Sequence, residues 1–228
     1  MNPALRRRCF AELLSTFCLV LMGCGAMAVD SRTGALTHVG VATVWGLIVL
    51  VMIFAVGRIS GAHMNPAVTI AFAIQGKMSF KDAIAYIVVQ CGGALLAAVA
   101  IRATLGLDES MLGATSVQLG LSPLVGMAIE FTLTAILMFV VMGVSTGAKE
   151  ESVTAALAVG STIAIEAFVC GPLTKASMNP ARSLGPAVVS GDMSELWLYL
   201  FGPIAGAIVG ALLYQTIQLP ANEDPQSV

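Results

Sequence analysis

The apolar residues of this chain fall in long blocks separated by short polar stretches. The blocks show neither the 3.6-residue period of an amphipathic helix nor the alternation of a half-buried strand. An apolar run of about 20 residues is what a helix needs to cross a bilayer. The pattern therefore predicts six membrane-spanning helices, at roughly 8–29, 36–57, 80–101, 122–144, 152–171 and 194–217.

Composition agrees with this interpretation. Hydrophobic residues make up 57% of the 228 and charged residues only 11%, whereas soluble domains carry about 25% charged residues. The alternative, a soluble helical bundle with an unusually apolar core, fits poorly. The basic run Arg6–Arg8 followed by an apolar block resembles the start of a secretion signal. That block is long enough to span the bilayer and lacks a clear cleavage site, so we predict a first membrane helix.

Charge and cysteine usage exclude other classes. The net charge is −2 and no basic stripe is present, which argues against nucleic-acid binding. The five cysteines show no CxxC spacing and no clustering with histidine, so we expect no metal and no cofactor. These cysteines are scattered through the apolar blocks, at Cys9, Cys18, Cys24, Cys91 and Cys170.

Two connections are too apolar to be plain loops. Residues 58–79 and 172–193 each contain one Asn-Pro-Ala sequence, followed by about ten mostly apolar residues at 66–75 and 180–189. A ten-residue helix is about 15 Å long, half of the roughly 30 Å hydrocarbon core. We therefore predict two re-entrant half-helices. Backbone at that depth is tolerated only where it is buried or lines a water-filled cavity.

The two Asn-Pro-Ala sequences lie in matching surroundings, SGAHMNPAVT from Ser60 and TKASMNPARS from Thr174. Asparagine is a favoured N-cap, and proline fits the first position of a helix. If the half-helices enter from opposite faces, their positive dipole ends meet near the centre and repel cations. The asparagine amides would offer N–H donors to a neutral solute. The motif residues are Asn65, Pro66 and Ala67, and Asn179, Pro180 and Ala181.

The repetition extends to the first helix of each half. Glu12 and Glu130 precede their asparagines by 53 and 49 residues. Each repeat contains three spans and one half-helix. Because three crossings are an odd number, the second repeat is inverted relative to the first, an arrangement typical of transport proteins. We expect both glutamates to accept hydrogen bonds from the re-entrant backbone. We expect one domain over 1–228, with repeats at about 8–101 and 122–217 and a cytoplasmic tail at 218–228.

Lysine and arginine counts predict the orientation. With six spans, both termini lie on one side, which carries seven basic residues against four on the other. The seven are Arg6, Arg7, Arg8, Arg58, Lys77, Lys81 and Lys149, and the four are Arg32, Arg102, Lys175 and Arg182. We therefore expect cytoplasmic termini.

Several stretches together resemble the aquaporin, or major intrinsic protein, family, over nearly the whole chain. They are AELLSTF, SGAHMNPAVT, the second-repeat IEF, SMNPARSLGPA and FGPIAGAIVGALL. The sequence is most similar to the nodulin-26-like (aquaglyceroporin-like) subgroup. The resemblance implies an all-α membrane protein with six transmembrane helices and two half-helices, one pore per chain, a homotetramer in a cell membrane and no cofactor.

The resemblance also places the constriction that selects solutes in this family. It implies a filter of Trp45, Ala167, Ala176 and Arg182, with His63 lining the inner vestibule. Strict water channels of the family usually carry histidine where this chain has Ala167, and glycerol-conducting members carry a small residue. The aperture should therefore be wide, with an apolar indole opposite the donors of Arg182.

The function that follows is a passive channel for water and small uncharged solutes, glycerol foremost, with urea, ammonia or neutral metalloid acids as further possibilities. Ser183 and Ala187 are more typical of water channels, so a strict water channel is the alternative. A secondary transporter would need titratable pairs at the midplane. An intramembrane hydrolase would need a catalytic set that two histidines, His38 and His63, do not supply. Glu166 and the connection 102–121 are candidates for gating.

Overall fold

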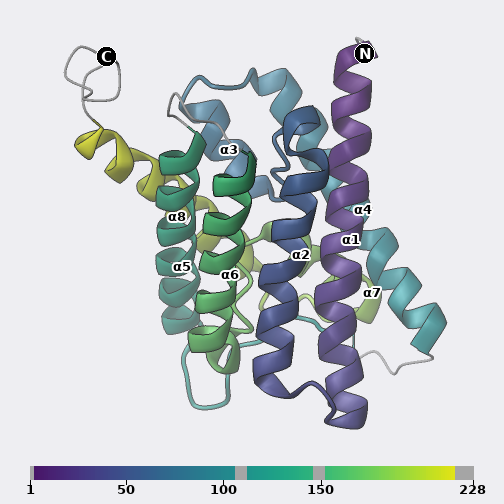
Figure 1. The fold of residues 1–228 in the computed structure, drawn as a ribbon. Helices are drawn as coiled ribbons and strands as arrows, with labels where there is room; N and C mark the ends of the chain where they lie inside the picture. Colours follow the sequence, from purple (N-terminus) through teal and green to yellow (C-terminus); the bar gives the residue numbers. More distant parts are fainter. Residues whose placement is uncertain (1–2, 106–111, 146–151, 219–228) are drawn as a thin grey trace.

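The computed structural model describes residues 3–105, 112–145 and 152–218, and these form eight helices and no strand (Figure 1). Six of them are long and apolar enough to cross a membrane, and α3 and α7 are short. The helices are α1 Pro3–Thr33, α2 Thr37–Ser60, α3 Pro66–Ile74, α4 Phe80–Leu105, α5 Pro123–Ser145, α6 Ser152–Thr174, α7 Pro180–Ser190 and α8 Leu196–Ile217.

The predicted spans and half-helices are therefore confirmed, with differences of a few residues at their ends that are largest in the first span. The first span was expected at 8–29, but α1 runs from Pro3 to Thr33. Its additional turns contain arginines and other polar residues, which can be helical although they are not apolar. A prediction from hydropathy alone therefore makes the helix too short. The predicted tail at 218–228 lies, apart from Gln218, outside the described residues.

Each half of the chain supplies three long helices and one short one. Within the halves α1 packs against α4, and α5 packs against α8. Between them α2 packs against α6, while α3 contacts α8 and α7 contacts α4. Each short helix is thus held by the last long helix of the opposite half. In Figure 1, α1 begins and α8 ends at the same end of the bundle, and α3 lies closer to that end than α7 does.

Glycines bring the long helices of each half into backbone contact at equivalent points. A Cβ atom at Gly93 of α4 would collide with the carbonyl of Leu13 in α1. A Cβ atom at Gly206 of α8 would collide with the carbonyl of Phe131 in α5. Small residues permit this close approach in membrane helices. The same glycine positions in both halves indicate that the two repeats pack alike.

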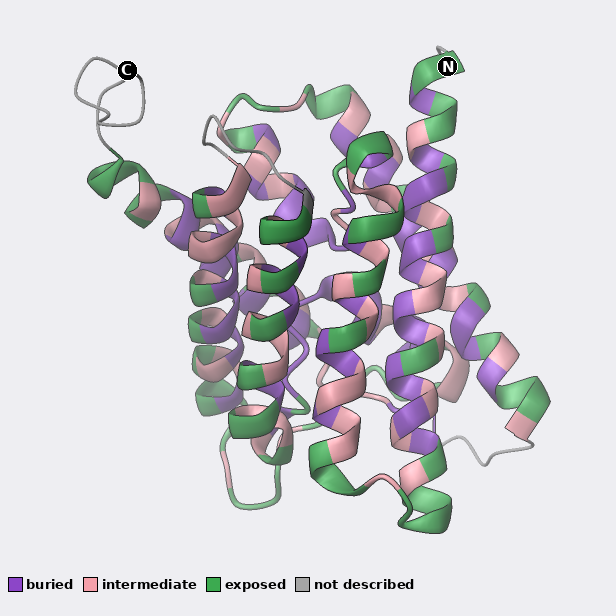
Figure 2. Cartoon of the chain, in the orientation of Figure 1, coloured by how far each residue is buried: buried purple, intermediate pink, exposed green. Residues whose placement is uncertain are grey.

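The exposed residues lie on the outward faces of the long helices, and the buried ones face the centre of the bundle (Figure 2). Large apolar side chains cover the exterior, among them Phe10 at 66% exposure and Val169 at 67%. The fully buried side chains include charged ones, Glu12, Glu130 and Arg182. An apolar exterior suits contact with lipid, and buried charges in a membrane protein indicate a functional or loop-supporting role.

Candidate functional site

Two loops lead into the short helices, and both contain residues with left-handed backbone conformations. In the first loop φ is 48° at Ala62 and 50° at Met64, and in the second it is 43° at Ala176 and 55° at Met178. Such angles cost of order 1–3 kcal/mol for a residue with a side chain and persist only where the surroundings enforce them. The two loops therefore share the same strained backbone conformation, and contacts with other residues must stabilise it in each.

Glu12 holds the first loop. Its Oε1 accepts hydrogen bonds from Ser60 Oγ at 2.6 Å and from the His63 amide at 2.9 Å. Its Oε2 accepts from the Met64 amide at 2.7 Å and from Gln90 Nε2 at 2.8 Å. The carboxyl group is fully buried, and each oxygen has two donors.

Glu130 holds the second loop in the same way. It accepts from Thr174 Oγ1 at 2.7 Å, the Ser177 amide at 2.9 Å and the Met178 amide at 2.7 Å. Each of these donors lies 114 positions after its counterpart in the first loop. Because the amides turn toward the glutamates, the carbonyls of residues 61–63 and 175–177 receive no hydrogen bond from the described residues. They remain available as acceptors.

Two tyrosines complete this support, and the sequence analysis missed them. Tyr86 Oη donates to the Ser60 carbonyl and Tyr199 Oη to the Thr174 carbonyl, both at 2.9 Å. Both side chains are completely buried. The signal was present, because the chain has only three tyrosines and these two lie 113 positions apart, in the third span of each half.

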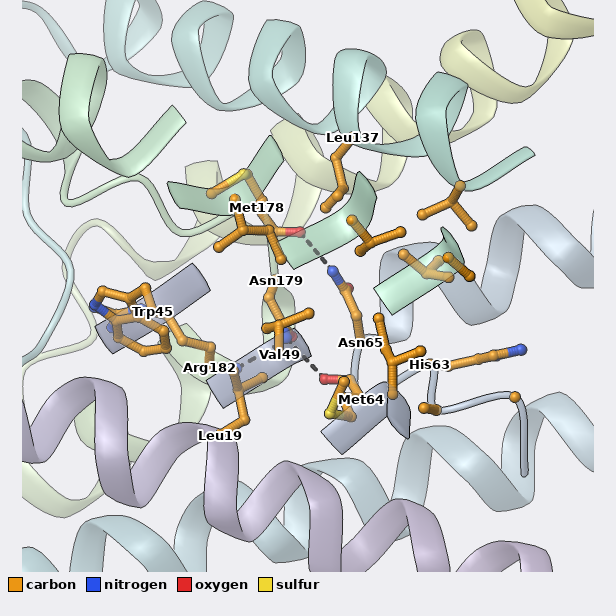
Figure 3. Close-up of a pocket in the computed structure, with 18 of the residues that line it drawn as sticks. Leu19, Trp45, Val49, His63, Met64, Asn65, Leu137, Met178, Asn179 and Arg182 are labelled. Atoms are coloured by element: carbon orange, nitrogen blue, oxygen red, sulfur yellow. Dashed lines mark hydrogen bonds between the residues drawn. The ribbon is translucent and has the colours of Figure 1, made fainter. Parts of the chain in front are cut away.

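The two asparagines cap the short helices and also join the two loops (Figure 3). Asn65 Oδ1 accepts from the Ala67 amide at 2.9 Å, and Asn179 Oδ1 accepts from the Ala181 amide at 3.0 Å. Pro66 and Pro180 occupy the first helical positions. The N-termini of α3 and α7 therefore face each other in the centre of the bundle.

The amide nitrogens of these asparagines make reciprocal bonds across the junction. Asn65 Nδ2 donates to the Met178 carbonyl and Asn179 Nδ2 to the Met64 carbonyl, both at 2.8 Å. Since an amide nitrogen carries two hydrogens, each asparagine keeps one N–H beyond the loop contact. The sequence predicts that these amides offer donors to the lumen, and the structure shows that one N–H of each instead joins the two halves.

A cavity of about 130 Å³ runs beside both loops. One wall is polar and consists of residues 61–65, residues 176–179 and Arg182. The rest is apolar apart from Ser145, with Leu19, Val49 and Leu137 among its side chains. The cavity is therefore amphipathic along its length, with donors and acceptors on one side and hydrocarbon on the other.

A second cavity, of about 350 Å³, is lined by Met27, Asp30 and Lys175 among others. His38, the second residue of α2, also lines it, and its Nε2 lies 2.8 Å from the Phe168 carbonyl. Trp45 borders both cavities. The boundary between the two spaces is therefore at the level of this indole ring.

The structure brings all four residues of the predicted filter to this boundary. Trp45 faces both cavities, Ala176 and Arg182 line the inner one, and Ala167 lines the outer one. The guanidinium carbon of Arg182 lies 4.8 Å from the centre of the Trp45 ring, within the range of a cation–π contact (Figure 3). The two alanines add little bulk to the walls of these cavities.

Arg182 is buried, with 1% exposure, and no acidic side chain of the described residues lies within hydrogen-bonding distance of it. Its Nη1 donates to the Gly113 carbonyl at 2.8 Å, and its Nη2 donates to Met27 Sδ at 3.1 Å. Neither contact was foreseen. Gly113 belongs to the connection 102–121, of which residues 106–111 lie outside the described part, and no motif connects it or Met27 to the arginine.

The remaining predicted residues also have defined surroundings. His63 lines the inner cavity and stacks on Phe72, with 4.8 Å between the ring centroids. Its Nδ1 lies 3.1 Å from Thr69 Oγ1. Glu166, beside Ala167, is buried, and neither of its oxygens has a hydrogen-bond partner among the described residues. No group of three or more potential metal ligands occurs in the described part of the chain.

Comparisons with known proteins agree with this geometry. The family model of the major intrinsic protein matches residues 1–214. The chain is 44% identical to Aquaporin NIP1-1 of Zea mays over 213 residues, which cover 93% of this chain and 75% of that protein. It is 44% identical to Aquaporin NIP1-2 of Arabidopsis thaliana over 218 residues, covering 93% and 74%.

Among solved structures, the fold matches the X-ray structure of the aquaglyceroporin from Plasmodium falciparum with a TM-score of 0.87. Sequence identity is 26%, and the match covers 93% of this chain and 96% of that one. The family consists of channels and not of enzymes, and its proteins pass water and small solutes across membranes. By its sequence, its helices and its paired central loops, this chain belongs to the major intrinsic protein family.

Proposed function

We propose that this protein is a passive channel for water and glycerol-sized uncharged solutes that excludes ions and protons. The observation that carries the proposal is the boundary between the two cavities, where Trp45 and Arg182 face a passage bordered by Ala167 and Ala176. Two of these four residues end at Cβ, so the passage is restricted mainly by one indole and one guanidinium. A pore of this family selects by diameter, lining hydrogen bonds and electrostatic barriers.

The chemistry of the boundary suits a polyol. The carbon chain of glycerol can lie against the indole of Trp45, while its hydroxyl groups accept from the guanidinium of Arg182. Deeper in, the carbonyls of residues 61–63 and 175–177 are acceptors for the hydroxyl hydrogens. Urea, ammonia and neutral metalloid acids share the small size and lack of charge that this passage requires.

Two sources of positive charge near the centre of the bundle support the exclusion of cations. Arg182 has no acidic partner within hydrogen-bonding distance in the described residues, and the positive ends of α3 and α7 point at one region. A water molecule that accepts from Asn65 and Asn179 directs its own hydrogens away from the centre in both directions. Such a molecule cannot relay a proton, which supports proton exclusion.

Stopped-flow light scattering on proteoliposomes tests the solute, with separate sucrose and glycerol gradients on the wild type and on Ala167→His. We expect the wild type to pass glycerol and the variant to pass mainly water, because an imidazole at position 167 fills the side of the passage that is now open. If the wild type passes water alone, the strict water channel is correct and these residues do not set the aperture.

We extend the proposal to the assembly as the family suggests it. The chain forms one channel domain with its own pore, four copies form a homotetramer, and the protein lies in the cell membrane with both termini cytoplasmic. The excess of basic residues on the side of the termini supports this orientation. Protease accessibility of an N-terminal tag in sealed vesicles, together with native mass spectrometry, tests orientation and assembly.

A further inference from the structure

The guanidinium of Arg182 is held by three different kinds of contact. The Gly113 carbonyl accepts from Nη1, the Met27 sulfur accepts from Nη2, and the Trp45 ring covers one face. A guanidinium carries five N–H donors, so three remain without a partner among the described residues. An arginine side chain has several rotatable bonds. These three contacts select one conformation and so fix where the remaining donors point.

Met27 is the least expected of the three partners. It lies on α1, is half-buried, and lines the outer cavity together with Trp45 and Ala167. It therefore sits at the same boundary as the four predicted filter residues but comes from a helix that supplies none of them. A thioether is a weak, polarizable acceptor without charge. It can orient an N–H group without cancelling the positive charge as a carboxylate would.

We infer that Met27 is a positioning residue of the filter, which holds Arg182 against the wall and so sets how far its donors extend into the passage. The inference rests on the proposed role of Arg182 in selecting solutes. Without the sulfur, the Nη2 hydrogen would lack a partner in a buried place, which is costly. The guanidinium would then turn toward the passage, where water and solute are the remaining acceptors, and the aperture would narrow.

Met27→Leu removes the acceptor and keeps the volume, a change that cores tolerate well. Met27→Gln replaces the sulfur with an amide oxygen that can accept the same hydrogen. Met22→Leu is the matched control, since Met22 lies on the same helix with 48% of its side chain exposed on the exterior. The readout is the ratio of glycerol to water permeability in proteoliposomes, which does not depend on how much protein is incorporated.

We expect the ratio to fall by roughly three- to tenfold in Met27→Leu, the effect of one lost hydrogen bond. It should return toward the wild-type value in Met27→Gln and stay unchanged in Met22→Leu. An unchanged ratio in Met27→Leu would overturn the inference. A ratio that stays low in Met27→Gln would overturn it too, because the thioether would then act through packing and not through its hydrogen bond.

The two proposals can fail separately. If the wild type passes glycerol and Met27→Leu has the same ratio, the proposed function stands and the role of Met27 is wrong. If the wild type excludes glycerol, the proposed solute is wrong, and water permeability per incorporated channel becomes the readout. In that case a reduced permeability in Met27→Leu with recovery in Met27→Gln supports the positioning role, and equal permeability in all variants refutes it.

Discussion

At the scale of single residues, the aperture depends on the position of one indole ring. The guanidinium of Arg182 covers the Trp45 ring, and Gly23 of α1 also lies against that ring. The ring fits only because position 23 has no side chain. The width of the passage is thus set partly by a glycine that does not line either cavity.

Gly23→Ala should therefore reduce glycerol permeability. A Cβ at position 23 would overlap the Trp45 ring and displace it, which changes the contact of the ring with Arg182 and the shape of both cavities that it borders. Gly25→Ala is the matched control, because a Cβ at position 25 meets no atom within 4 Å. Both changes improve helix propensity by about 1 kcal/mol. Stopped-flow measurements should show a several-fold lower glycerol permeability for Gly23→Ala only, and equal values for the two variants would contradict this account.

At the scale of elements, the position of each short helix depends on a buried glutamate, which holds the preceding loop in a strained backbone conformation. The left-handed residues Ala176 and Met178 flank Ser177, and the carboxyl group of Glu130 binds the amides of Ser177 and Met178. The strain is thus offset by charge-assisted hydrogen bonds, which are among the strongest available in a buried site. The same contact therefore stabilises the loop and positions Ala176, which we propose as a filter residue.

Two buried glutamates should respond oppositely to the same substitution. Glu130→Gln places an amide nitrogen opposite the backbone donors and should destabilise the protein by about 3 kcal/mol or more, since hydrogen bonds to a charged group contribute about 1.5–3 kcal/mol each. Glu166→Gln removes a buried carboxyl that has no partner among the described residues, and burial of such a group is costly. It should leave stability equal or higher.

Thermal unfolding in detergent, followed by a thiol-reactive dye or by tryptophan fluorescence, measures this difference as a shift in midpoint relative to the wild type. Because unfolding of membrane proteins is often irreversible, the variants are compared at one scan rate. A Glu166→Gln midpoint as low as that of Glu130→Gln would show that Glu166 has a supporting role equal to that of Glu130.

Much of the helical architecture could be predicted from the sequence, because each part has a local signal. Apolar length gave the spans, and the Asn-Pro pairs gave the start of α3 and α7 at Pro66 and Pro180. The contacts around Arg182 could not be predicted. They depend on Gly113 and Met27, which lie 69 and 155 positions away in the chain and carry no pattern of their own.

At the scale of the whole molecule, helices of the two halves pack so closely that their relative movement is restricted. A Cβ on Gly46 would lie 2.6 Å from the Gly160 carbonyl oxygen, and a Cβ on Gly185 would lie 2.5 Å from the Ala94 carbonyl oxygen. The helices of opposite halves therefore touch backbone to backbone. The reciprocal bonds of the two asparagines add a further link at the centre. A carrier has to move one repeat against the other, and these contacts oppose that motion.

Solute flux should accordingly be that of an open pore. Glycerol influx into proteoliposomes is expected to rise in proportion to the gradient without saturation, with a low activation energy and no acceleration by glycerol on the opposite side. The reason is that both cavities exist in one arrangement of the helices and meet at Trp45, so no step of the transport cycle waits for a rearrangement. Empty liposomes and the Ala167→His variant serve as controls for leakage and for flux outside the pore. Saturation in the millimolar range together with accelerated exchange would instead show that the halves do move, and that the glycine contacts across α2 and α6 are not rigid.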